Sequence, residues 1–192
     1  MHNIVLFGPP GAGKGTQSEK LIEHYNLLHI STGDLFRKHL GEGTDLGKKA
    51  KGYMDEGKLV PDQLVVDMVD DKMQEDHEKG GTIFDGFPRT IPQAEALDKL
   101  LESKGMPIAV TVMLDVPDDE LIHRLLDRGK TSGRTDDQDE NKISTRLQVY
   151  KDETLPVANY YKAQGKLSIV DGVGSINDIF ERIVTAVDAA SS

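Results

Sequence analysis

The sequence predicts one doubly wound α/β domain, in which five parallel strands form a single sheet with helices on both faces. Short apolar segments of strand-forming residues alternate with longer segments whose apolar residues recur at helical spacing. The chain of 192 residues is long enough for one well-buried core and too short for two independent domains to be the default. We therefore expect a single domain over residues 1–192.

The five candidate strands are short and apolar, as parallel strands covered on both faces should be. They lie at 3–7, 28–30, 82–85, 109–115 and 167–171. Helix starts are indicated where a glycine turn, a capping residue or a proline precedes an apolar stripe. These starts are Lys14, Pro61-Asp62, Thr90, Pro117-Asp118-Asp119 and Ser175. The stripes indicate core packing and carry no information about chemistry.

Two segments interrupt the alternation of strands and helices. Residues 31–60 hold a weakly apolar helical pattern punctuated by glycines, which predicts a small helical insert that could move on the core. Residues 129–139 are polar and flanked by glycine, which predicts a short lid between two helices. The ranges 1–30, 61–128 and 140–192 would then form the core. Taken alone, either segment would be better explained as a plain solvated loop, and the arginines described below are what favour a functional role.

The composition limits the partners. A formal net charge of −10 and a pI near 5.0 oppose a surface for nucleic acid or anionic membranes, since both would repel the protein at long range. The chain has no cysteine, and its six histidines lack metal-ligand spacing, so we expect no disulfides and no zinc. No apolar run approaches the length of a membrane span, and Met1 to Asn3 lead straight into the first strand. We expect a cytoplasmic protein, by default a monomer.

The most informative segment is the first strand and the turn that follows it. Ile4 to Phe7 run into the glycine-rich segment Gly8 to Thr16, and a helical pattern begins at Lys14. Glycines let the backbone approach a polyphosphate, the helix N-terminus directs amides at it, and Lys14 can reach its outer phosphates. These features predict a nucleoside triphosphate site. Its expected contacts are Gly11, Ala12, Gly13, Lys14, Gly15 and Thr16.

The turn departs from the general phosphate-loop pattern at one position. That pattern has Ser or Thr directly after the lysine, whereas this chain has Gly15 there and Thr16 one place later. The displaced hydroxyl is typical of nucleoside monophosphate kinases rather than of switch GTPases or ATPase motors.

The arginines indicate further phosphate contacts. The chain has only seven, and the arginine fork fits phosphate oxygens bidentately. Arg124 and Arg128 share one helical face, and Arg134 lies in the expected lid. Arg37 begins the insert, and Arg89 follows the third strand. A single arginine would more often form a surface ion pair, but five in glycine-flanked or strand-end positions favour a phosphate site.

One arginine stands apart from this pattern. Arg182 lies in the last helix beside the core positions Ile179 and Ile183, and it matches no motif. By its spacing it should project to solvent, so we expect its removal to have almost no effect on activity.

Over its whole length the sequence resembles adenylate kinases of the short-lid form. Besides the phosphate loop, the resemblance rests on Ser31 to Arg37, Gly57 to Val60, Asp85 to Gln93, and Ser132 to Asp137 with Arg146. The segment between Asp137 and Arg146 is one residue longer than in the commonest pattern. The resemblance implies Mg²⁺-dependent phosphoryl transfer between ATP and AMP, with ADP as the product.

The resemblance also implies roles for individual residues. Arg37 and Arg89 would hold the AMP phosphate, and Thr32 and Gln93 would face its adenine. The full AMP set would be Thr32, Arg37, Lys58, Leu59, Val60, Gly86, Arg89, Gln93, Arg134 and Arg146. The transferring group would be surrounded by the catalytic residues Lys14, Arg89, Arg124, Arg128, Arg134 and Arg146. The ATP site would be completed by Arg128 and Gly174.

The chemistry of such a transfer agrees with these residue types. Bringing two phosphate anions together requires positioning and positive charge rather than covalent catalysis. A phosphate acceptor is already ionised near neutral pH and needs no general base. Asp85 ends the third strand beside the arginine motif and is the candidate for holding hydrated Mg²⁺ through water. Asp115, at the end of the fourth strand, is its rival.

Three alternatives remain open. A UMP/CMP kinase would share most motifs, although its pattern resembles Ser-Ala-Gly-Asp where this chain has Ser31 to Asp34, and Asn where it has Thr90. A phosphate-loop hydrolase or switch would explain Lys14 but not the second group of arginines. A nonenzymatic nucleotide sensor would explain both and need no Mg²⁺ group. ADP formation from ATP with and without AMP separates these possibilities.

Overall fold

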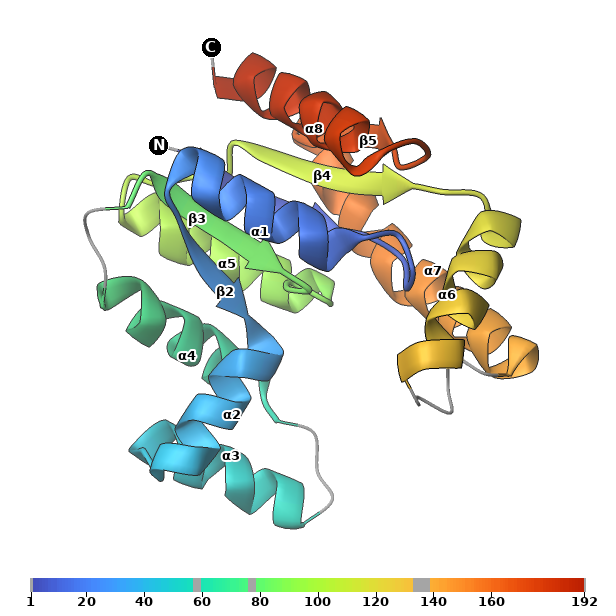
Figure 1. The fold of residues 1–192 in the computed structure, drawn as a ribbon. Coiled ribbons are helices and arrows are strands. Elements are labelled where there is room, and N and C mark those ends of the chain that lie inside the picture. The colour runs from blue at the N-terminus through green and yellow to red at the C-terminus, as the bar shows by residue number, and fades with distance from the viewer. Residues whose placement is uncertain (1, 57–59, 76–78, 133–138, 192) are drawn as a thin grey trace.

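The fold is built on one parallel sheet with the strand order β2-β3-β1-β4-β5 (Figure 1). The computed structural model describes residues 2–56, 60–75, 79–132 and 139–191. The strands are β1 (His2–Phe7), β2 (Leu27–Ser31), β3 (Gly81–Asp85), β4 (Val110–Asp115) and β5 (Leu167–Asp171). The predicted five-stranded parallel sheet is confirmed, with each strand within about one residue of its expected limits.

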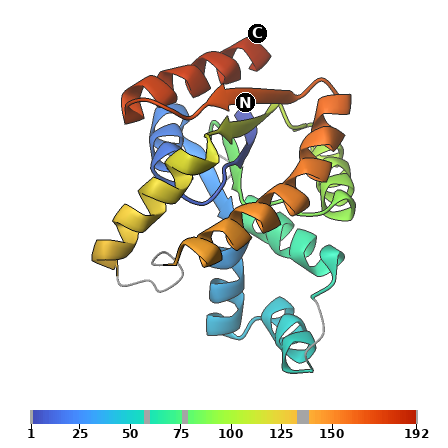
Figure 2. The ribbon, with the colours of Figure 1, turned by 90° about the vertical axis from the view of Figure 1, so that its right-hand side faces the viewer.

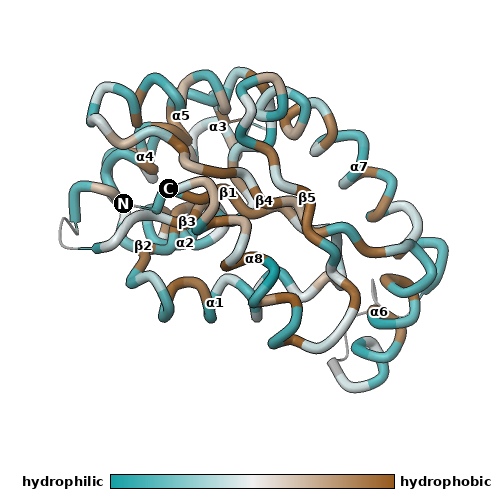
Figure 3. Tube along the Cα trace, turned by 90° about the horizontal axis from the view of Figure 1, so that it is seen from above, coloured by the Kyte–Doolittle hydropathy of each residue, from teal (hydrophilic) through white to brown (hydrophobic). Residues whose placement is uncertain are grey.

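Helices cover both faces of the sheet, as Figure 3 shows in a view along its edge. In β1, Ile4 and Leu6 belong to one buried cluster while Val5 and Phe7 belong to the other, because successive side chains point to opposite faces. One cluster includes residues of α1 (Lys14–Tyr25) and α8 (Ile176–Ser191). The other includes residues of α4 (Asp62–Gln74) and α5 (Ile91–Ser103). The sheet therefore has a buried hydrophobic core on each face, and these two cores hold the carboxyl ends of its strands in place.

The expected capping residues begin their helices. Thr90 precedes α5, and its hydroxyl accepts a hydrogen bond from the backbone N–H of Gln93 at 3.2 Å. The Ser175 hydroxyl accepts one from the N–H of Asp178 at 3.1 Å at the start of α8. Both bonds satisfy N–H groups that a helix start leaves without an intrahelical partner.

The predicted insert contains two helices, α2 (Thr32–Glu42) and α3 (Asp45–Asp55), which project from one end of the sheet (Figure 1). Leu35 and Ala50 are buried and join the core cluster, so the insert packs on the domain and is not a solvated loop. The buried His39 ring nitrogen Nδ1 lies 2.6 Å from the hydroxyl of Thr44, the residue that precedes α3. Residues 57–59 of the insert lie outside the described residues.

Two glycines in α3 make a matched pair for testing this packing. A Cβ on Gly47 would lie 2.1 Å from the backbone oxygen of His39, whereas a Cβ on Gly52 would meet nothing within 4 Å. Gly47→Ala is expected to lower the free energy of unfolding by about 1–3 kcal/mol, as other overpacked sites do. Gly52→Ala is expected to raise it by about 0.5–1 kcal/mol, because alanine favours the helix. Urea denaturation measures both; equal effects of the two substitutions would contradict the close approach of α2 and α3.

The helix α6 (Asp118–Ser132) and the 24-residue helix α7 (Glu140–Ala163) lie side by side, with their near ends on the same side of the molecule as the insert (Figure 2). The predicted lid 129–139 thus begins within α6, which continues through Ser132. Residues 133–138 lie outside the described residues. Asp139 caps α7, because its carboxylate accepts from the N–H of Asn141 at 2.8 Å. No helix in the described part of the chain is both long and apolar enough to cross a membrane.

Candidate active site

The turn after β1 has the geometry of an anion-binding loop. Gly11 has a φ of +86° and Gly13 a φ of +83°, a region that favours glycine. Gly13 directly precedes α1, and the positions of a Cβ on Gly13 and on Gly15 meet nothing within 4 Å. The space beside Gly13 and Gly15 is therefore open at the start of α1, where the first N–H groups have no intrahelical partner and the helix N-terminus attracts negative charge.

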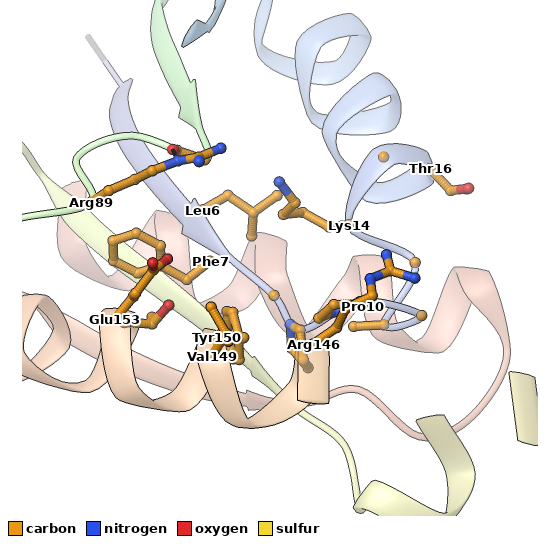
Figure 4. Close-up of a pocket in the computed structure, with 18 of the residues that line it drawn as sticks. Leu6, Phe7, Pro10, Lys14, Thr16, Arg89, Arg146, Val149, Tyr150 and Glu153 are labelled. Carbon is orange, nitrogen blue, oxygen red and sulfur yellow. Dashed lines mark hydrogen bonds between the residues drawn. The ribbon is translucent and has the colours of Figure 1, made fainter. Parts of the chain in front are cut away.

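This turn forms one wall of a cavity of about 750 Å³. The cavity is lined by four cationic side chains from separate parts of the chain: Lys14, Arg89, Arg128 and Arg146. Figure 4 shows Arg146 reaching from α7 toward the phosphate loop, while Arg89 lies on the other side of Lys14. Four cations around one cavity in a chain of net charge −10 provide a local site for several phosphate groups.

Lys14 is held at the end of β3 by an acidic side chain. Its Nζ donates to Oδ1 of Asp85, and the His29 ring nitrogen Nε2 lies 3.2 Å from Oδ2 of the same carboxylate. Burial alone would raise the pKa of Asp85, but the hydrogen bonds and charges of His29 and Lys14 outweigh it and hold that pKa below its ordinary value. Asp85 is therefore ionised at neutral pH, with both oxygens directed at cationic or hydrogen-bonding groups.

The segment after β3 fixes Arg89 in the cavity wall. Arg89 Nε donates to the backbone oxygen of Gly86 at 2.9 Å, and Gly86 has a φ of +71° that favours glycine. A Cβ on Gly86 would lie 3.7 Å from Lys14 Nζ and 3.8 Å from Arg89 Nη2, so these two cations converge on one point. The peptide bond between Phe87 and Pro88 is cis.

Gln93 links this segment to α4. Its Oε1 accepts from the N–H of Arg89 at 2.9 Å, and its Nε2 donates to Asp62 Oδ1 at 3.0 Å. Thr32 opens α2, and Arg37 on the same helix pairs with Asp34 and is 74% exposed. These three expected AMP contacts do not line the cavity around Lys14. Thr32 and Arg37 lie on α2 of the insert, and Gln93 lies in the first turn of α5.

Two arginines differ from their expected surroundings. Arg124 does not line the cavity; its Nη1 donates to the backbone oxygen of Gly11 at 3.5 Å and its Nη2 to that of Gly172 at 3.3 Å. Arg182 is exposed, as expected, but it is not free of contacts, because its Nη1 donates to the backbone oxygens of Asp171 at 3.0 Å and Val173 at 2.6 Å. In both cases the guanidinium binds at least one backbone carbonyl of the turn after β5, Gly172 for Arg124 and Val173 for Arg182, which no side-chain spacing reveals.

Several expected contacts lie outside the described residues, namely Lys58, Leu59 and Arg134. Val60 is described and packs against the core cluster that contains Val5 and Phe7. Gly174 lies in the turn after β5, near Arg182, and does not line the cavity.

The face of α7 toward the cavity was not predicted from the sequence. Besides Arg146 it contributes Thr145, Val149, Tyr150, Glu153 and Thr154. The spacing of these residues, three to four apart, is the signal of one helical face and would have identified them once Arg146 was placed on a helix.

The pKa of Tyr150 is raised by burial and by the nearby carboxylate of Asp115. Neither Asp115 nor Asp85 lines the cavity, but Asp85 accepts a hydrogen bond from Lys14, which does line it, and this contact favours Asp85 as the acidic group of the site.

Comparisons with known proteins agree with this geometry. The family model described as adenylate kinase matches residues 6–166. An adenylate kinase of Bacteroides fragilis is 53% identical over 188 residues, which cover 98% of this chain and 99% of that protein. Adenylate kinases of Flavobacterium johnsoniae and Porphyromonas gingivalis are 52% and 48% identical over the same length, covering 98% of this chain and 99% and 96% of theirs. The chain belongs to the adenylate kinase family.

Proposed function

We infer that this chain is an ATP:AMP phosphotransferase, which catalyses the reversible conversion of ATP and AMP into two molecules of ADP. The observation that carries the inference is the convergence of Lys14, Arg89, Arg128 and Arg146 on the cavity beside the phosphate loop. A simple hydrolase needs one phosphate cradle, whereas cations on two sides of Lys14 suit two phosphate chains that meet there. The full-length identity to adenylate kinases supports the same assignment.

The proposed division of the site follows the elements. ATP binds the phosphate loop from Gly11 to Thr16. Arg128 contacts the phosphates of ATP, and Gly174 contacts its adenine. AMP binds between the cavity and the insert, with Arg37 and Arg89 on its phosphate and Thr32 and Gln93 at its adenine. Lys58, Leu59, Val60, Gly86, Arg134 and Arg146 complete the AMP set. Arg124, which contacts Gly11 and Gly172, supports the loop from outside the cavity.

Catalysis by these residues is electrostatic and positional. The arginines bring the two anions together and compensate the charge on the transferring phosphoryl group. Such charge compensation is worth more in a closed site, because excluded water no longer screens it. We propose that the insert and the lid supply this closure and retain the reacting nucleotides.

Asp85 fits the role of an outer-shell ligand of Mg²⁺. It is a single carboxylate, 16% exposed, with a lowered pKa, and it lies beside the lysine of the phosphate loop. Mg²⁺ typically keeps several waters and takes its remaining ligands from carboxylates and substrate phosphates, so one acidic residue suffices. When bound with ATP, the ion neutralises phosphate charge and fixes the geometry of the phosphate chain. We propose that no zinc is required, and that the protein acts as a monomer in the cytoplasm.

A coupled assay for ADP tests the proposed function. ADP formation is expected to require ATP, AMP and Mg²⁺ together, and to be much slower with CMP or UMP in place of AMP. The polar pocket at Thr32 and Gln93 would leave groups unpaired when a pyrimidine enters. Equal rates with AMP and CMP would favour a UMP/CMP kinase. Hydrolysis of ATP without AMP would favour a hydrolase, and binding of both nucleotides without turnover would favour a sensor.

A further inference from the structure

The side chain of Arg182 holds the turn between β5 and α8 by hydrogen bonds to the backbone of that turn. From α8, its Nη1 donates to the oxygens of Asp171 and Val173, at 3.0 Å and 2.6 Å. The carboxylate of Asp171 lies 3.9 Å from the same nitrogen, and the side chain is 40% exposed, so the exposed ion pair adds little. Charge-assisted hydrogen bonds to two carbonyls are the stronger restraint, and they fix the peptide on the N-terminal side of Gly174.

Gly174 is the residue of this turn whose backbone N–H and oxygen are available to a ligand. Its φ is +130°, and a Cβ there would lie 3.4 Å from Arg182 Nη2, so a side chain at this position would be strained and crowded. The N–H of Val173 is bound to Asp171 Oδ1 at 3.0 Å, and the oxygen of Ser175 accepts from Ile179. Within the described part of the chain, neither the N–H nor the oxygen of Gly174 makes a hydrogen bond.

The same turn borders the phosphate loop. The Arg124 guanidinium binds the oxygen of Gly172 at 3.3 Å and that of Gly11 in the phosphate loop at 3.5 Å. On the other side, Gln17 of α1 donates from Nε2 to the oxygen of Ile176 at 3.1 Å. Gln17 is 2% exposed, so the donor side of this part-buried contact is held in the core. The available peptide groups of Gly174 therefore belong to a turn that is connected to the phosphate loop through Arg124 and to α1 through Gln17.

We propose that Arg182 is a positioning residue for the donor nucleotide, because it fixes the Gly174 peptide groups where they pair with the base of ATP. The inference rests on the proposed function, which assigns Gly174 to the ATP site. A backbone carbonyl accepts from the 6-amino group of adenine but repels the 6-oxo group of guanine, so a fixed peptide also selects the base. Arg182 does not touch ATP; it removes the ordering cost that a loose turn would add to binding.

The test separates the base end of ATP from its phosphate end. Binding of ATP and of inorganic tripolyphosphate is measured by calorimetry, and KM is measured for ATP, GTP and AMP. Arg182→Ala is expected to raise the Kd and KM of ATP roughly five- to tenfold, the size of one lost hydrogen bond or ordering step. The Kd of tripolyphosphate and the KM of AMP should stay unchanged, and the preference for ATP over GTP should fall.

Two further variants control the experiment. Arg182→Lys can still donate to both carbonyls and should recover most of the ATP affinity. Glu181→Ala, at the neighbouring exposed position of α8, should change none of these quantities.

An unchanged Kd for ATP in Arg182→Ala would overturn the proposal. Equal weakening of ATP, tripolyphosphate and AMP with a lower melting temperature would also overturn it, because that pattern is a general structural effect. A wild-type protein that binds ATP without forming ADP would refute the proposed function, while the calorimetry would still test Arg182.

Discussion

Arg89→Ala is expected to lower kcat/KM for both nucleotides about a hundredfold or more, equivalent to roughly 3 kcal/mol of transition-state stabilisation. Arg89 lines the cavity beside Lys14 and is aimed by its bond to the Gly86 oxygen. Its guanidinium would compensate charge on the transferring phosphoryl group. Arg128→Ala should have a similar effect, and Arg128→Lys should recover only part of it, because a point charge cannot supply the bidentate fork.

The control for this series has to be chosen from the structure. Arg182 is unsuitable, because it holds the turn after β5. Lys51 on α3 is 67% exposed, and its ion-pair partner among the described residues is Asp55, one helical turn away, in a solvent-screened contact that contributes little. Lys51→Ala should leave kcat/KM almost unchanged at fixed ionic strength. If Lys51→Ala were as damaging as Arg89→Ala in proteins with normal thermal melting, a specific role for the cavity arginines would be wrong.

The sheet was predictable because its strands are covered on both faces. Such strands are continuous apolar runs, and the run from Ile4 to Phe7 leads directly into the glycine turn, so sequence alone locates both strand and loop. The residues that follow strand ends, such as Lys14 and Arg89, could then be grouped, since the carboxyl ends of parallel strands lie at one edge. The structure brings these two side chains together at Gly86.

The helix α7 was harder to predict, because its buried residues do not form one stripe. Ile143 and Leu147 belong to the cluster on one face of the sheet, and Val157 and Tyr161 belong to the cluster on the other. Pro156 also lies within the helix, where it removes a backbone donor. A change of face and an internal proline both weaken the helical periodicity that sequence reasoning uses. The cavity face of α7 was missed for this reason.

Side-chain spacing predicts the ion pair of Arg124 with Glu120, but it could not predict the backbone contacts of Arg124 and Arg182. Both guanidinium groups bind backbone carbonyls, and a carbonyl is present at every position of the chain. Helical spacing placed Arg182 correctly beside the core positions Ile179 and Ile183 but gave no information on where its long side chain would end. Only the path of the turn after β5 supplies its partners.

Lys14→Met is expected to reduce kcat/KM for ATP by at least about a hundredfold, because the side chain keeps its length but loses the charge that reaches the outer phosphates. The matched control is Lys20→Met on the same helix. Lys20 lies away from the cavity, with its Nζ 5.2 Å from the centre of the Phe180 ring. Lys20→Met should change kcat/KM by less than about twofold, because Lys20 does not line the cavity and makes no contact that transition-state binding would use.

The same substitution has a second consequence that needs no nucleotide. Lys14 helps to hold the pKa of Asp85 below its ordinary value, so Lys14→Met should raise that pKa and leave the carboxylate with its contact to His29. A carboxyl group with a depressed pKa stabilises the fold at pH values above its unfolded pKa and loses this effect as pH falls through its folded pKa. The stability advantage of wild type over Lys14→Met should therefore be present at neutral pH and narrow below about pH 4, near the ordinary value of 3.8. Urea denaturation at pH 7 and pH 3 measures the difference. An advantage that is independent of pH would mean that Lys14 does not stabilise the fold through the ionised carboxylate of Asp85.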